Sequence, residues 1–557
     1  MTAPVPVTAP VAVAPAVAAM AVAPVVAKAC AWLASQAPGA TLTADSRRVQ
    51  HGDVFFAYAA APDDGVPRDG RDFIEDAIAR GAVAVVHDDA GFVWPPTIPV
   101  PHLACPKLQQ IAGPIASGYY GQPDAAMFSV AVTGTNGKTS CSQWLGNALS
   151  RAGLPTLVVG TFGTGLVENG KNADFNSTGY TTPDALQLQA ALAEARERGA
   201  RALAIEASSI GLQQQRMRGL HIDVALFTNL TRDHLDYHGD MPAYEAAKTA
   251  LFEWPGLGHA VINLDDPMGQ RLVARLRSNA PAVRLTGYSR QLDATAATRM
   301  LGPQATFLAA SEIRGSHAGT QFQLLALQTA QTSDSPHSTT HAPQVPFPSR
   351  VLLKTRLVGD FNVSNVLGVL GVLLARGQSL PIALGAIELL QPVAGRMQQI
   401  GGPEQPLVVI DYAHTPDALE KTLASLRSLA DARHGALWCV FGCGGDRDPG
   451  KRPQMGAVAQ AADHVIVTSD NPRSELAAAI IADIVAGIDP QRAPHVIEDR
   501  ASAILWALRH AARADVILLA GKGHENTQEI KGRKLQFLDA DHAALGLQAR
   551  ATMKGLA

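Results

Sequence analysis

The chain has 557 residues, 47% of them hydrophobic and 17% charged, which is more material than one hydrophobic core normally serves. We therefore expect a multidomain globular protein. The 46 basic and 49 acidic residues nearly cancel, which excludes a chain-wide electrostatic field, and we expect neither nucleic-acid binding nor insertion into a membrane.

Residues 1–27 form a run rich in Ala, Val and Pro that lacks the basic start of a signal peptide. Its prolines would interrupt a helix that could span a bilayer, so we expect a disordered extension. The five cysteines include no CxxC pair, which argues against a disulfide framework and a structural zinc site. This cysteine usage favours a cytoplasmic protein.

Residues 28–124 are predicted to form a small N-terminal α/β domain, with a helix over 71–80 followed by the apolar run GAVAVVHDD. Residues 125–356 alternate apolar runs, such as MFSVAVTG, LPTLVVGT and ARALAIEASS, with helical stretches such as PDALQLQAALAEARERG. This alternation predicts a parallel sheet covered on both faces. Within it, residues 328–349 are rich in Ser, Thr, Pro and His and are expected to be a flexible insertion.

Residues 357–557 repeat the alternation and predict a C-terminal Rossmann-like α/β domain. Its apolar runs are each followed by polar and glycine residues, as in DHVIVTSDNPR and ADVILLAGKGHE. Open α/β sheets bind ligands beyond the carboxyl ends of their strands. These segments are therefore where we expect the chemistry to lie.

The segment VTGTNGKTS predicts a phosphate-binding loop between a strand and a helix, although Val132 stands where the usual P-loop pattern has glycine. Gly134 and Gly137 would let backbone N–H groups face the phosphates, and the helix would add the positive end of its dipole. The alternative is a glycine-rich turn without a ligand. The expected ATP contacts in this loop are Gly134, Thr135, Asn136, Gly137, Lys138, Thr139 and Ser140.

Glu206 ends one apolar run, and NLTRDHLDYHG places His234 at the end of another. Carboxylate and imidazole groups beside a triphosphate suit Mg²⁺, which takes few protein ligands and leaves its other positions to water and phosphate. In the alternative interpretation, Asp233 caps a helix and the histidines lie at the surface.

Lys248 lies on a predicted helix that Asp240 would cap, and it shares a partly apolar face with Tyr244 and Phe252. A partly buried amine has a lowered pKa, and only the neutral amine can take up carbon dioxide to form a carbamate. The alternative is a solvated ion pair between Glu245 and Lys248.

The loop Gly-Thr-Asn-Gly-Lys-Thr resembles that of the Mur ligases and of the related folylpolyglutamate synthetases, and the likeness continues through nearly the whole chain. DSRRVQHGDVFFA resembles a segment of the Mur ligases that add the third residue of the peptidoglycan stem peptide. The resemblance implies three α/β domains and an ATP-dependent ligase that joins meso-diaminopimelate to UDP-N-acetylmuramoyl-L-alanyl-D-glutamate through an acyl phosphate.

The resemblance also implies site residues. Lys138, Glu206 and His234 match residues that serve catalysis in the family. Thr139, Glu206 and His234 match positions at the metal. Lys248 matches a catalytic lysine that is N6-carboxylated in the family and bridges to Mg²⁺. Asn362, Asn365 and Arg396 match further ATP contacts, and Asp411 and His414 match a segment of ligases that close over ATP. The residues matching contacts to the UDP-linked substrate are Ser46, Thr181, Thr182, Ser208, Gln214 and Arg216.

One position departs from the family pattern, because Ile210 stands where the segment E-V-S-S-H-G-L has histidine. The DNPR segment matches the members that take meso-diaminopimelate, whereas lysine-adding relatives lack its Arg473. A planar guanidinium can hold the distal carboxylate of the amino acid with two hydrogen bonds. The residues matching that amino-acid site are Arg447, Asp470, Asn471, Pro472, Arg473, Gly521 and Glu525.

We expect a monomer with small-molecule substrates. Two other interpretations remain open: a lysine-adding or folylpolyglutamate synthetase-like ligase, and a non-catalytic module that only binds nucleotide.

Overall fold

The computed structural model describes residues 15–60, 68–171, 174–316, 319–328, 349–402 and 404–555. Its chain divides into two compact units. Unit 1 comprises Met1–Met127, Ser177–Arg201 and Ile210–His221, and unit 2 comprises Phe128–Asn176, Ala202–Ser209 and Ile222–Ala557. The predicted central domain is therefore not continuous in sequence, because two of its segments pack with the N-terminal residues.

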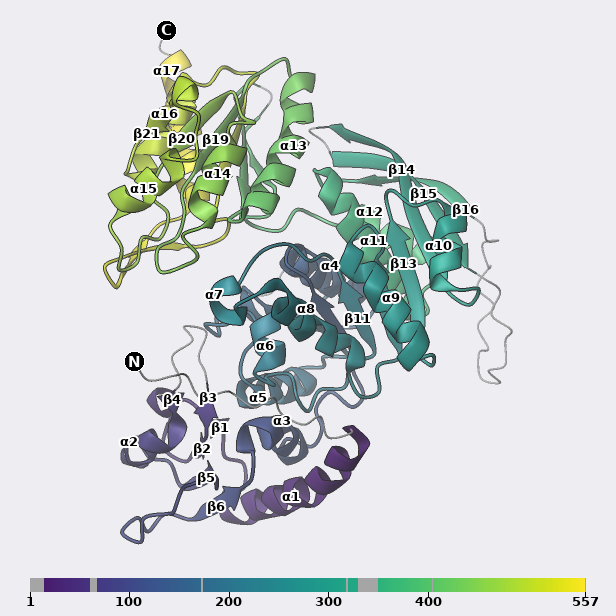
Figure 1. Ribbon diagram of the computed structural model, residues 1–557, viewed down its shortest axis with the longest axis vertical. Helices are drawn as coiled ribbons and strands as arrows, with labels where there is room; N and C mark the ends of the chain where they lie inside the picture. The colour runs from purple at the N-terminus through teal and green to yellow at the C-terminus, as the bar shows by residue number, and fades with distance from the viewer. Residues whose placement is uncertain are drawn as a thin grey trace, which may run out of the picture. The chain divides into compact units, whose positions relative to one another are not determined.

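Unit 1 contains a four-stranded parallel sheet in the order β1-β2-β5-β6. Alternate residues of its strands face opposite sides: Phe56 and Val86 pack with α1, α3 and α5, whereas Phe55 and Val85 pack with α2. Helices therefore cover both faces of this sheet (Figure 1). The elements are α1 (Pro15–Gln36), β1 (Leu42–Thr43), β2 (Val54–Ala57), α2 (Ile74–Ala79), β5 (Ala84–Asp88), β6 (His102–Cys105), α3 (Leu108–Tyr119) and α5 (Ala185–Glu197).

Helix α1 corrects the expectation of a disordered extension over residues 1–27. The helix begins at Pro15 and continues through Pro24, while residues 1–14 lie outside the described part of the chain. Its later half buries Ala29 and Leu33 in the core of unit 1. An internal proline removes one backbone hydrogen bond, and this anchoring offsets that cost.

The larger sheet of unit 2 has ten strands in the order β16-β15-β14-β13-β12-β11-β7-β10-β8-β9. Strands β14 through β8 in that order are parallel, as predicted, but β9 and the β14–β15–β16 meander pair antiparallel at the two edges. The strands are β7 (Phe128–Thr133), β8 (Thr156–Gly160), β9 (Gly163–Val167), β10 (Ala202–Glu206), β11 (Val224–Phe227), β12 (His259–Asn263), β13 (Arg284–Ser289), β14 (Thr306–Ser316), β15 (Gly319–Gln328) and β16 (Ser349–Thr355). The insertion was expected over residues 328–349, but Gln328 ends β15 and Ser349 begins β16, and residues 329–348 lie outside the described residues.

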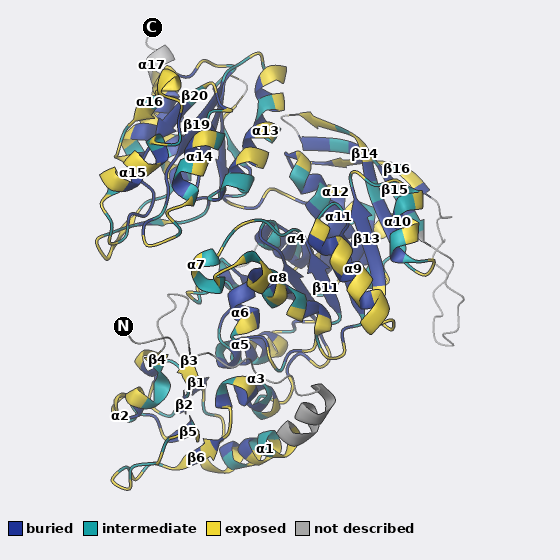
Figure 2. Cartoon of the chain, viewed as in Figure 1, coloured by how far each residue is buried: buried dark blue, intermediate teal, exposed yellow. Residues whose placement is uncertain are grey.

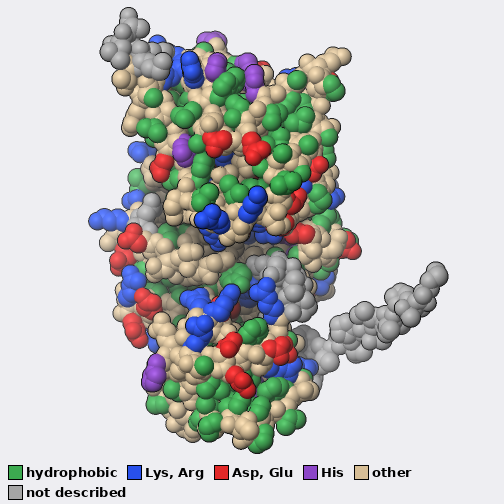
Figure 3. Space-filling view, turned by 90° about the vertical axis from the view of Figure 1, so that its left-hand side faces the viewer, with side chains coloured by type: hydrophobic (Ala, Val, Ile, Leu, Met, Phe, Trp, Pro, Cys, Tyr) green, Lys and Arg blue, Asp and Glu red, His purple; other side chains and the backbone are tan. Residues whose placement is uncertain are grey.

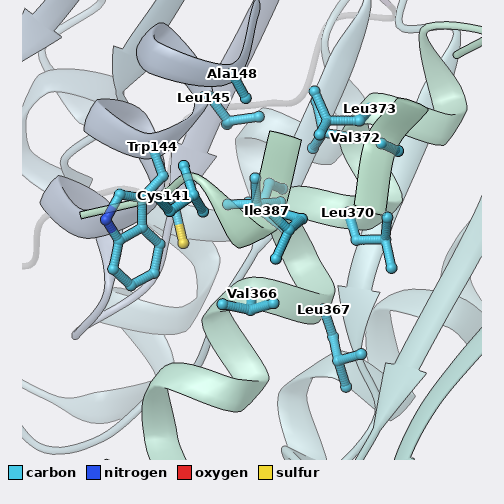
Figure 4. Close-up of a cluster of buried hydrophobic side chains, with 14 of the residues drawn as sticks. Cys141, Trp144, Leu145, Ala148, Val366, Leu367, Leu370, Val372, Leu373 and Ile387 are labelled. Carbon is cyan, nitrogen blue, oxygen red and sulfur yellow. The ribbon is translucent and has the colours of Figure 1, made fainter. Parts of the chain in front are cut away.

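One face of this sheet is covered by α4 (Lys138–Arg151), α11 (Asp360–Ala375) and α12 (Leu380–Glu388). In Figure 4, Leu145 and Ala148 of α4 point toward the apolar side chains of α11. Trp144 adds a hydrogen bond from its indole N–H to the carbonyl of Gln391 at 2.9 Å. Each fully buried Leu or Val contributes about 1.5 to 3 kcal/mol, so this cluster holds the start of α4, which follows the glycine-rich loop, in place.

The second sheet of unit 2 has the order β17-β18-β22-β19-β20-β21 and is parallel except for β17. Helices α13, α14 and α15 pack on one face, and α16 and α17 on the other. Figure 2 shows its strands buried and the outer faces of its helices exposed. The elements are β17 (Gln398–Ile400), β18 (Leu407–Asp411), α13 (Pro416–Ala432), β19 (Leu437–Phe441), α14 (Lys451–Ala459), β20 (His464–Val467), α15 (Ala477–Val485), β21 (His495–Val496), α16 (Arg500–His510), β22 (Val516–Ala520) and α17 (Asp539–Gly555).

A fully buried ion pair joins the first residues of α16 and α17. The guanidinium of Arg500 donates to both carboxylate oxygens of Asp539, at 2.8 and 2.7 Å, and to the carbonyl of Ala520 at 3.0 Å. Both side chains have no exposed surface. The pair therefore ties the C-terminal helix to the last residue of β22.

These sheets with helices on both faces confirm the predicted α/β class. Among the helices of the described ranges, none is long and apolar enough to cross a lipid bilayer. The face drawn in Figure 3 carries both basic and acidic side chains among hydrophobic ones, in keeping with the nearly balanced charge.

Candidate active site

The predicted phosphate loop connects β7 to α4 in unit 2, as the sequence pattern requires. Gly134 has φ 150°, and a Cβ there would lie 1.9 Å from the hydroxyl of Thr228. Gly137 has φ 88° and is the N-cap of α4, where no side chain takes up the free N–H groups. Both glycines are needed for the path of the loop, and its backbone donors at the helix start suit an anion.

Hydrogen bonds hold the loop against the segment after β11. The N–H of Thr135 donates to the carbonyl of Asn229 at 2.8 Å, and the N–H of Asn136 donates to the side-chain oxygen of Asn229 at 3.0 Å. Ser140 is buried in the first turn of α4. These hydrogen bonds therefore tie the loop to the segment that follows the neighbouring strand β11.

Two lysines donate to the same loop carbonyl. Lys138 Nζ lies 2.8 Å from the oxygen of Gly134 and 2.9 Å from that of Thr135. Lys248 Nζ, from α8 (Met241–Thr249), lies 2.9 Å from the same oxygen of Gly134. Burial lowers the pKa of Lys138, whereas Glu206 acts in the opposite direction.

Lys248 is only 1% exposed, and its ammonium nitrogen lies 4.4 Å from the centre of the Tyr244 ring. Burial lowers its pKa well below the ordinary value, and the charge of Lys138 lowers it further. The alternative ion pair with Glu245 is wrong, because Glu245 pairs with Arg271 at 2.6 Å. Asp240 caps α8 as predicted, accepting from the N–H of Ala243.

The carboxylate of Glu206 meets the first turn of α4. Thr139 Oγ1 donates to Glu206 Oε2 at 3.0 Å, and the N–H of Thr161 donates to Glu206 Oε1 at 2.8 Å. Arg396 also reaches this point, with Nη2 3.1 Å from Thr139 Oγ1. No sequence motif points to Thr161, although it is the last residue of the predicted strand run LPTLVVGT and directly follows β8.

These oxygens fit the preference of Mg²⁺ for hard ligands, since Thr139 Oγ1 and Glu206 Oε2 are already 3.0 Å apart beside the phosphate loop. In the part of the chain that the structure describes, no group of three or more His, Cys, Asp or Glu side chains could hold a metal ion. Thr139 and Glu206 by themselves would therefore leave the other positions of a cation to phosphate, water and further groups of the site.

Asp233 and His234 follow β11, as expected, but Asp233 does not cap a helix. Its carboxylate lies 3.5 Å from His234 Nε2 and 4.0 Å from His414 Nε2. Burial alone would raise the pKa of Asp233, but His234 and His414 outweigh it and bring the pKa down to about 2. The side chain of His234 is 43% exposed, in agreement with the alternative that placed this histidine at the surface.

Helix α11 brings both predicted asparagines to the loop. A Cβ on Gly137 would lie 2.5 Å from Asn365 Oδ1, so the side chain of Asn365 lies directly against the loop backbone. Asn365 donates to Asn362 at 3.1 Å, and Asn362 donates to the carbonyl of Val358 at 2.8 Å. Both side chains are buried.

Three strand ends of the C-terminal sheet bring together the residues predicted to bind the amino acid. Asn471, after β20, donates to Glu525 Oε2 at 2.7 Å, and Arg473 donates to the carbonyl of Gly445 at 2.7 Å. A Cβ on Gly521 would lie 2.6 Å from the carboxylate of Asp470. Pro472 is buried, whereas Arg447 is exposed and donates to the carbonyl of Asp446.

Lys522 is a buried member of this cluster that sequence reasoning missed. It is 0% exposed and donates to Asn471 Oδ1 at 3.1 Å, Glu525 Oε2 at 3.1 Å and the carbonyl of Thr527 at 2.8 Å. Its position in AGKGHE, directly after a predicted strand, was the available signal.

Unit 1 holds most of the residues expected to contact the UDP-linked substrate. Arg216 donates to Gln214 Oε1 at 2.7 Å and to the carbonyl of Thr182 at 3.0 Å, and its guanidinium lies 4.5 Å from the centre of the Tyr180 ring. Ser46 and Thr181 belong to the same unit, whereas Ser208 belongs to unit 2. Tyr180 was not among the residues that the sequence predicted for this site.

Ile210, at the position where the family pattern has histidine, is 9% exposed within α6 (Ser209–Gln213). Its side chain counts among the buried hydrophobic residues.

The chain matches two family models. Residues 132–373 match the Mur ligase middle domain, and residues 395–523 match the glutamate ligase domain of the Mur ligases. The likeness therefore covers both sheets of unit 2.

Similar proteins cover nearly the whole chain. The UDP-N-acetylmuramoyl-L-alanyl-D-glutamate--2,6-diaminopimelate ligase of Janthinobacterium sp. (strain Marseille) is 60% identical over 523 residues, covering 93% of this chain and 96% of that protein. The protein of the same name from Ralstonia nicotianae (strain ATCC BAA-1114 / GMI1000) is 50% identical over 525 residues, covering 93% of this chain and 95% of that protein.

Solved structures also align with nearly the whole chain. A UDP-N-acetylmuramoyl-L-alanyl-D-glutamate--2,6-diaminopimelate ligase aligns with a TM-score of 0.60 and 35% identity, covering 92% of this chain and 95% of that one. The MurF ligase of Thermotoga maritima, solved with ADP, has a TM-score of 0.60 at 16% identity, covering 92% and 98%, and is similar in fold alone. Together with the phosphate loop and the strand-end residues, these likenesses establish that the chain belongs to the Mur ligase family.

Proposed function

We propose that this chain is the ATP-dependent ligase that adds meso-diaminopimelate to UDP-N-acetylmuramoyl-L-alanyl-D-glutamate in peptidoglycan biosynthesis. The relatives that are 60% and 50% identical carry this activity in their names. The observation that carries the proposal is the cluster of Asn471, Arg473 and Glu525 in the unit that also holds the phosphate loop. That cluster offers a guanidinium and a carboxylate to an amino acid.

A carboxylate is a poor electrophile, so amide formation needs activation first. ATP would bind with its phosphates at Gly134–Ser140, and its terminal phosphoryl group would pass to the D-glutamyl side-chain carboxylate to form an acyl phosphate. Lys138, released from the carbonyls of Gly134 and Thr135, would neutralise the charge that develops on the transferred group. Asn362, Asn365 and Arg396 would hold the rest of the nucleotide.

Thr139 and Glu206 would hold Mg²⁺, and His234 and a carboxylated Lys248 would complete its surroundings. When bound, the cation neutralises phosphate charge and orients the reacting oxygens. Lys248 suits carboxylation because its amine is buried, has a lowered pKa and has no carboxylate partner among the described residues. Carbon-13 NMR of the protein in labelled bicarbonate should give a carbamate signal that Lys248→Met removes.

The amine of diaminopimelate would then attack the acyl carbon. Its distal carboxylate would meet Arg473, with Arg447 beside it, and its distal ammonium would meet Glu525, near Asp470, Pro472 and Gly521. Loss of a proton from the attacking amine and collapse of the tetrahedral adduct expel inorganic phosphate and leave the amide, ADP having formed in the phosphoryl transfer. Ser46, Thr181, Thr182, Ser208, Gln214 and Arg216 would hold the UDP-linked substrate, and the enzyme's contribution is placement and charge neutralisation.

A phosphate-release assay tests the proposal. Phosphate should appear only when ATP, the UDP-linked dipeptide substrate and meso-diaminopimelate are all present, and L-lysine should replace meso-diaminopimelate poorly. Equal rates with lysine would favour a lysine-adding enzyme, and no release under any condition would favour a module that only binds nucleotide. We also propose a cytoplasmic monomer, which sedimentation and cell fractionation can test.

A further inference from the structure

The residues predicted to bind the amino acid, which include Asn471, Arg473 and Glu525, are called the amino-acid cluster below. This cluster contains a buried lysine, Lys522, that has no role in the proposed reaction. The side chain of Lys522 has no exposed surface. Its Nζ lies 3.1 Å from Glu525 Oε2 and 3.9 Å from Asp470 Oδ1. One ammonium thus faces two carboxylates, while the nearby guanidinium of Arg500 is paired with Asp539. Buried charges persist when they are paired and hydrogen-bonded, so this arrangement has room for a second cation.

The hydrogen bonds of Lys522 also fix the groups around it. Asn471 Oδ1 accepts from Lys522 and from the N–H of Glu529 at 3.0 Å, which leaves its amide N–H₂ to donate to Glu525. The orientation of the Asn471 amide is therefore set by two donors on one oxygen. Replacing the lysine would remove that constraint.

The two oxygens of Glu525 have different surroundings. Oε2 accepts from both Asn471 and Lys522, at 2.7 and 3.1 Å, whereas Oε1 has one long contact in the described structure, to the hydroxyl of Tyr412 at 3.4 Å. The side chain is 29% exposed. A carboxylate can accept several hydrogen bonds, so Oε1 retains capacity for a donor from solvent or substrate.

We propose that Lys522 is a positioning residue of the amino-acid site. Its ammonium holds Asn471 and Glu525 in place, so that Glu525 Oε1 receives the distal ammonium of the incoming amino acid as the second cation of the cluster. This inference rests on the proposed function, because it takes a diamino acid as the substrate.

The charge of Lys522 also affects the protonation of Glu525. Burial alone would raise the pKa of Glu525, but Lys522, the hydrogen bond from Asn471 and the nearby His524 bring it below its usual value. The other charged or titratable groups facing Glu525 are Asp470, Tyr412 and Arg500. Removing Lys522 therefore removes the main cation that keeps Glu525 ionised.

The test is Lys522→Met in the full-length enzyme, assayed with meso-diaminopimelate. We expect KM for the amino acid to rise at least about tenfold, kcat to change less, and KM for ATP to stay within about twofold. The acid limb of kcat/KM for the amino acid should move to higher pH, because Glu525 then protonates more readily. A purely structural role would not shift that limb selectively.

Lys534→Met is the matched control, because Lys534 is an exposed lysine on β24 (Arg533–Gln536) of the same unit. It should leave both KM values and the pH profile unchanged. An unchanged KM and acid limb in Lys522→Met, with wild-type enzyme turning over diaminopimelate, would overturn the inference alone. Wild-type enzyme that does not use diaminopimelate would instead overturn the proposed function.

A double variant keeps the test decisive if Lys522→Met does not fold. Glu525→Gln combined with Lys522→Met removes both partners of the ion pair, so no carboxylate of that pair is left without its cation. Because Lys522 acts through Glu525, the double variant should have a KM for the amino acid within about twofold of Glu525→Gln alone. A further large rise in the double variant would show that Lys522 acts by another route.

Discussion

Two lysines of unit 2 are fully buried: Lys248, on helix α8 beside the phosphate loop, and Lys522, just after β22, among the residues predicted to bind the amino acid. Lys248 donates to a backbone carbonyl and lies against the Tyr244 ring, without a carboxylate partner among the described residues. Lys522 is ion-paired with Glu525 and donates to a side-chain amide and a carbonyl.

The difference shows that burial alone does not decide the use of a lysine. At the phosphate loop, desolvation and the neighbouring Lys138 act together to lower the pKa of Lys248, which favours an amine able to react. In the amino-acid cluster, the ammonium has carboxylate partners and serves as a fixed charge. The first setting favours the neutral amine that the proposed carbamate needs, and the second keeps its lysine as a paired cation.

The largest expected effect is on turnover in Lys248→Ala. We expect kcat to fall by about 10²- to 10³-fold, the range for loss of one positioned electrostatic group. Formate or acetate should restore part of the activity by replacing the carbamate. Lys354→Ala, which changes an exposed lysine of β16, is the control. A complete absence of rescue would count against the carbamate.

The next largest effects are expected on the free energy of unfolding, with opposite signs for the two lysines. Lys522→Met should lower the free energy of unfolding by about 3 kcal/mol, because it removes the cation between the buried Asp470 and the partly buried Glu525. Lys248→Met should raise it by about 1 to 3 kcal/mol, because it removes a buried amine that is costly to hold. Urea unfolding at pH 7 without bicarbonate measures both, and changes of the same sign would contradict the comparison.

The stability effect at Lys248 should also depend on pH. Its folded-state pKa is below the ordinary 10.5, so the unfolded chain binds a proton that the folded chain does not. The free energy of unfolding of the wild-type protein should therefore decrease as pH falls from about 10.5 toward the folded-state pKa of Lys248. The advantage of Lys248→Met should grow over the same interval, and a constant difference would show that the folded-state pKa is not lowered.

A smaller effect is expected at Arg473, whose guanidinium is partly used by the carbonyl of Gly445. Arg473→Ala should raise KM for diaminopimelate by about ten- to a hundredfold, from the loss of charge-assisted hydrogen bonds, while KM for ATP stays nearly constant. Arg509→Ala, an exposed position on α16, should change neither constant. Equal losses for both substrates would remove Arg473 from the amino-acid site.

The smallest effect is expected outside both sites. Strands β15 and β16 pair antiparallel with Ala326 opposite Ser349, so a short turn can connect them. Replacing residues 329–348 by a Gly-rich turn should leave kcat within about twofold of wild type. A large loss in the same assay would show that this segment contributes to turnover.

The sequence predicted the α/β class, the phosphate loop and the cap of α8, because each depends on local patterns: alternating apolar runs, glycine spacing and a capping aspartate. It did not predict the antiparallel edges of the ten-stranded sheet or the packing of α5 with the N-terminal residues. Those features depend on contacts between distant segments. Local polarity cannot reveal them.

The same limit explains the site residues that were missed. Thr161 and Lys522 are typical of polar positions after a strand, and only the fold shows which carboxylate each contacts. The pairing of Glu245 with Arg271 depends on a neighbouring helix, α9 (Pro267–Asn279), so the spacing of Glu245 and Lys248 was misleading. Proline spacing likewise failed for α1, where tertiary packing holds the helix.

The buried pair of Arg500 and Asp539 ties the C-terminal helix α17 to the strand end that precedes Gly521, one of the proposed amino-acid contacts. Its guanidinium donates to the carbonyl of Ala520, the residue before Gly521, while its partner begins α17. A nonsense mutation or protease cut that removed the final helix would therefore leave the guanidinium of Arg500 buried without its carboxylate, next to Ala520 and Gly521. Truncated products of this gene should lose amino-acid selection even where nucleotide binding survives.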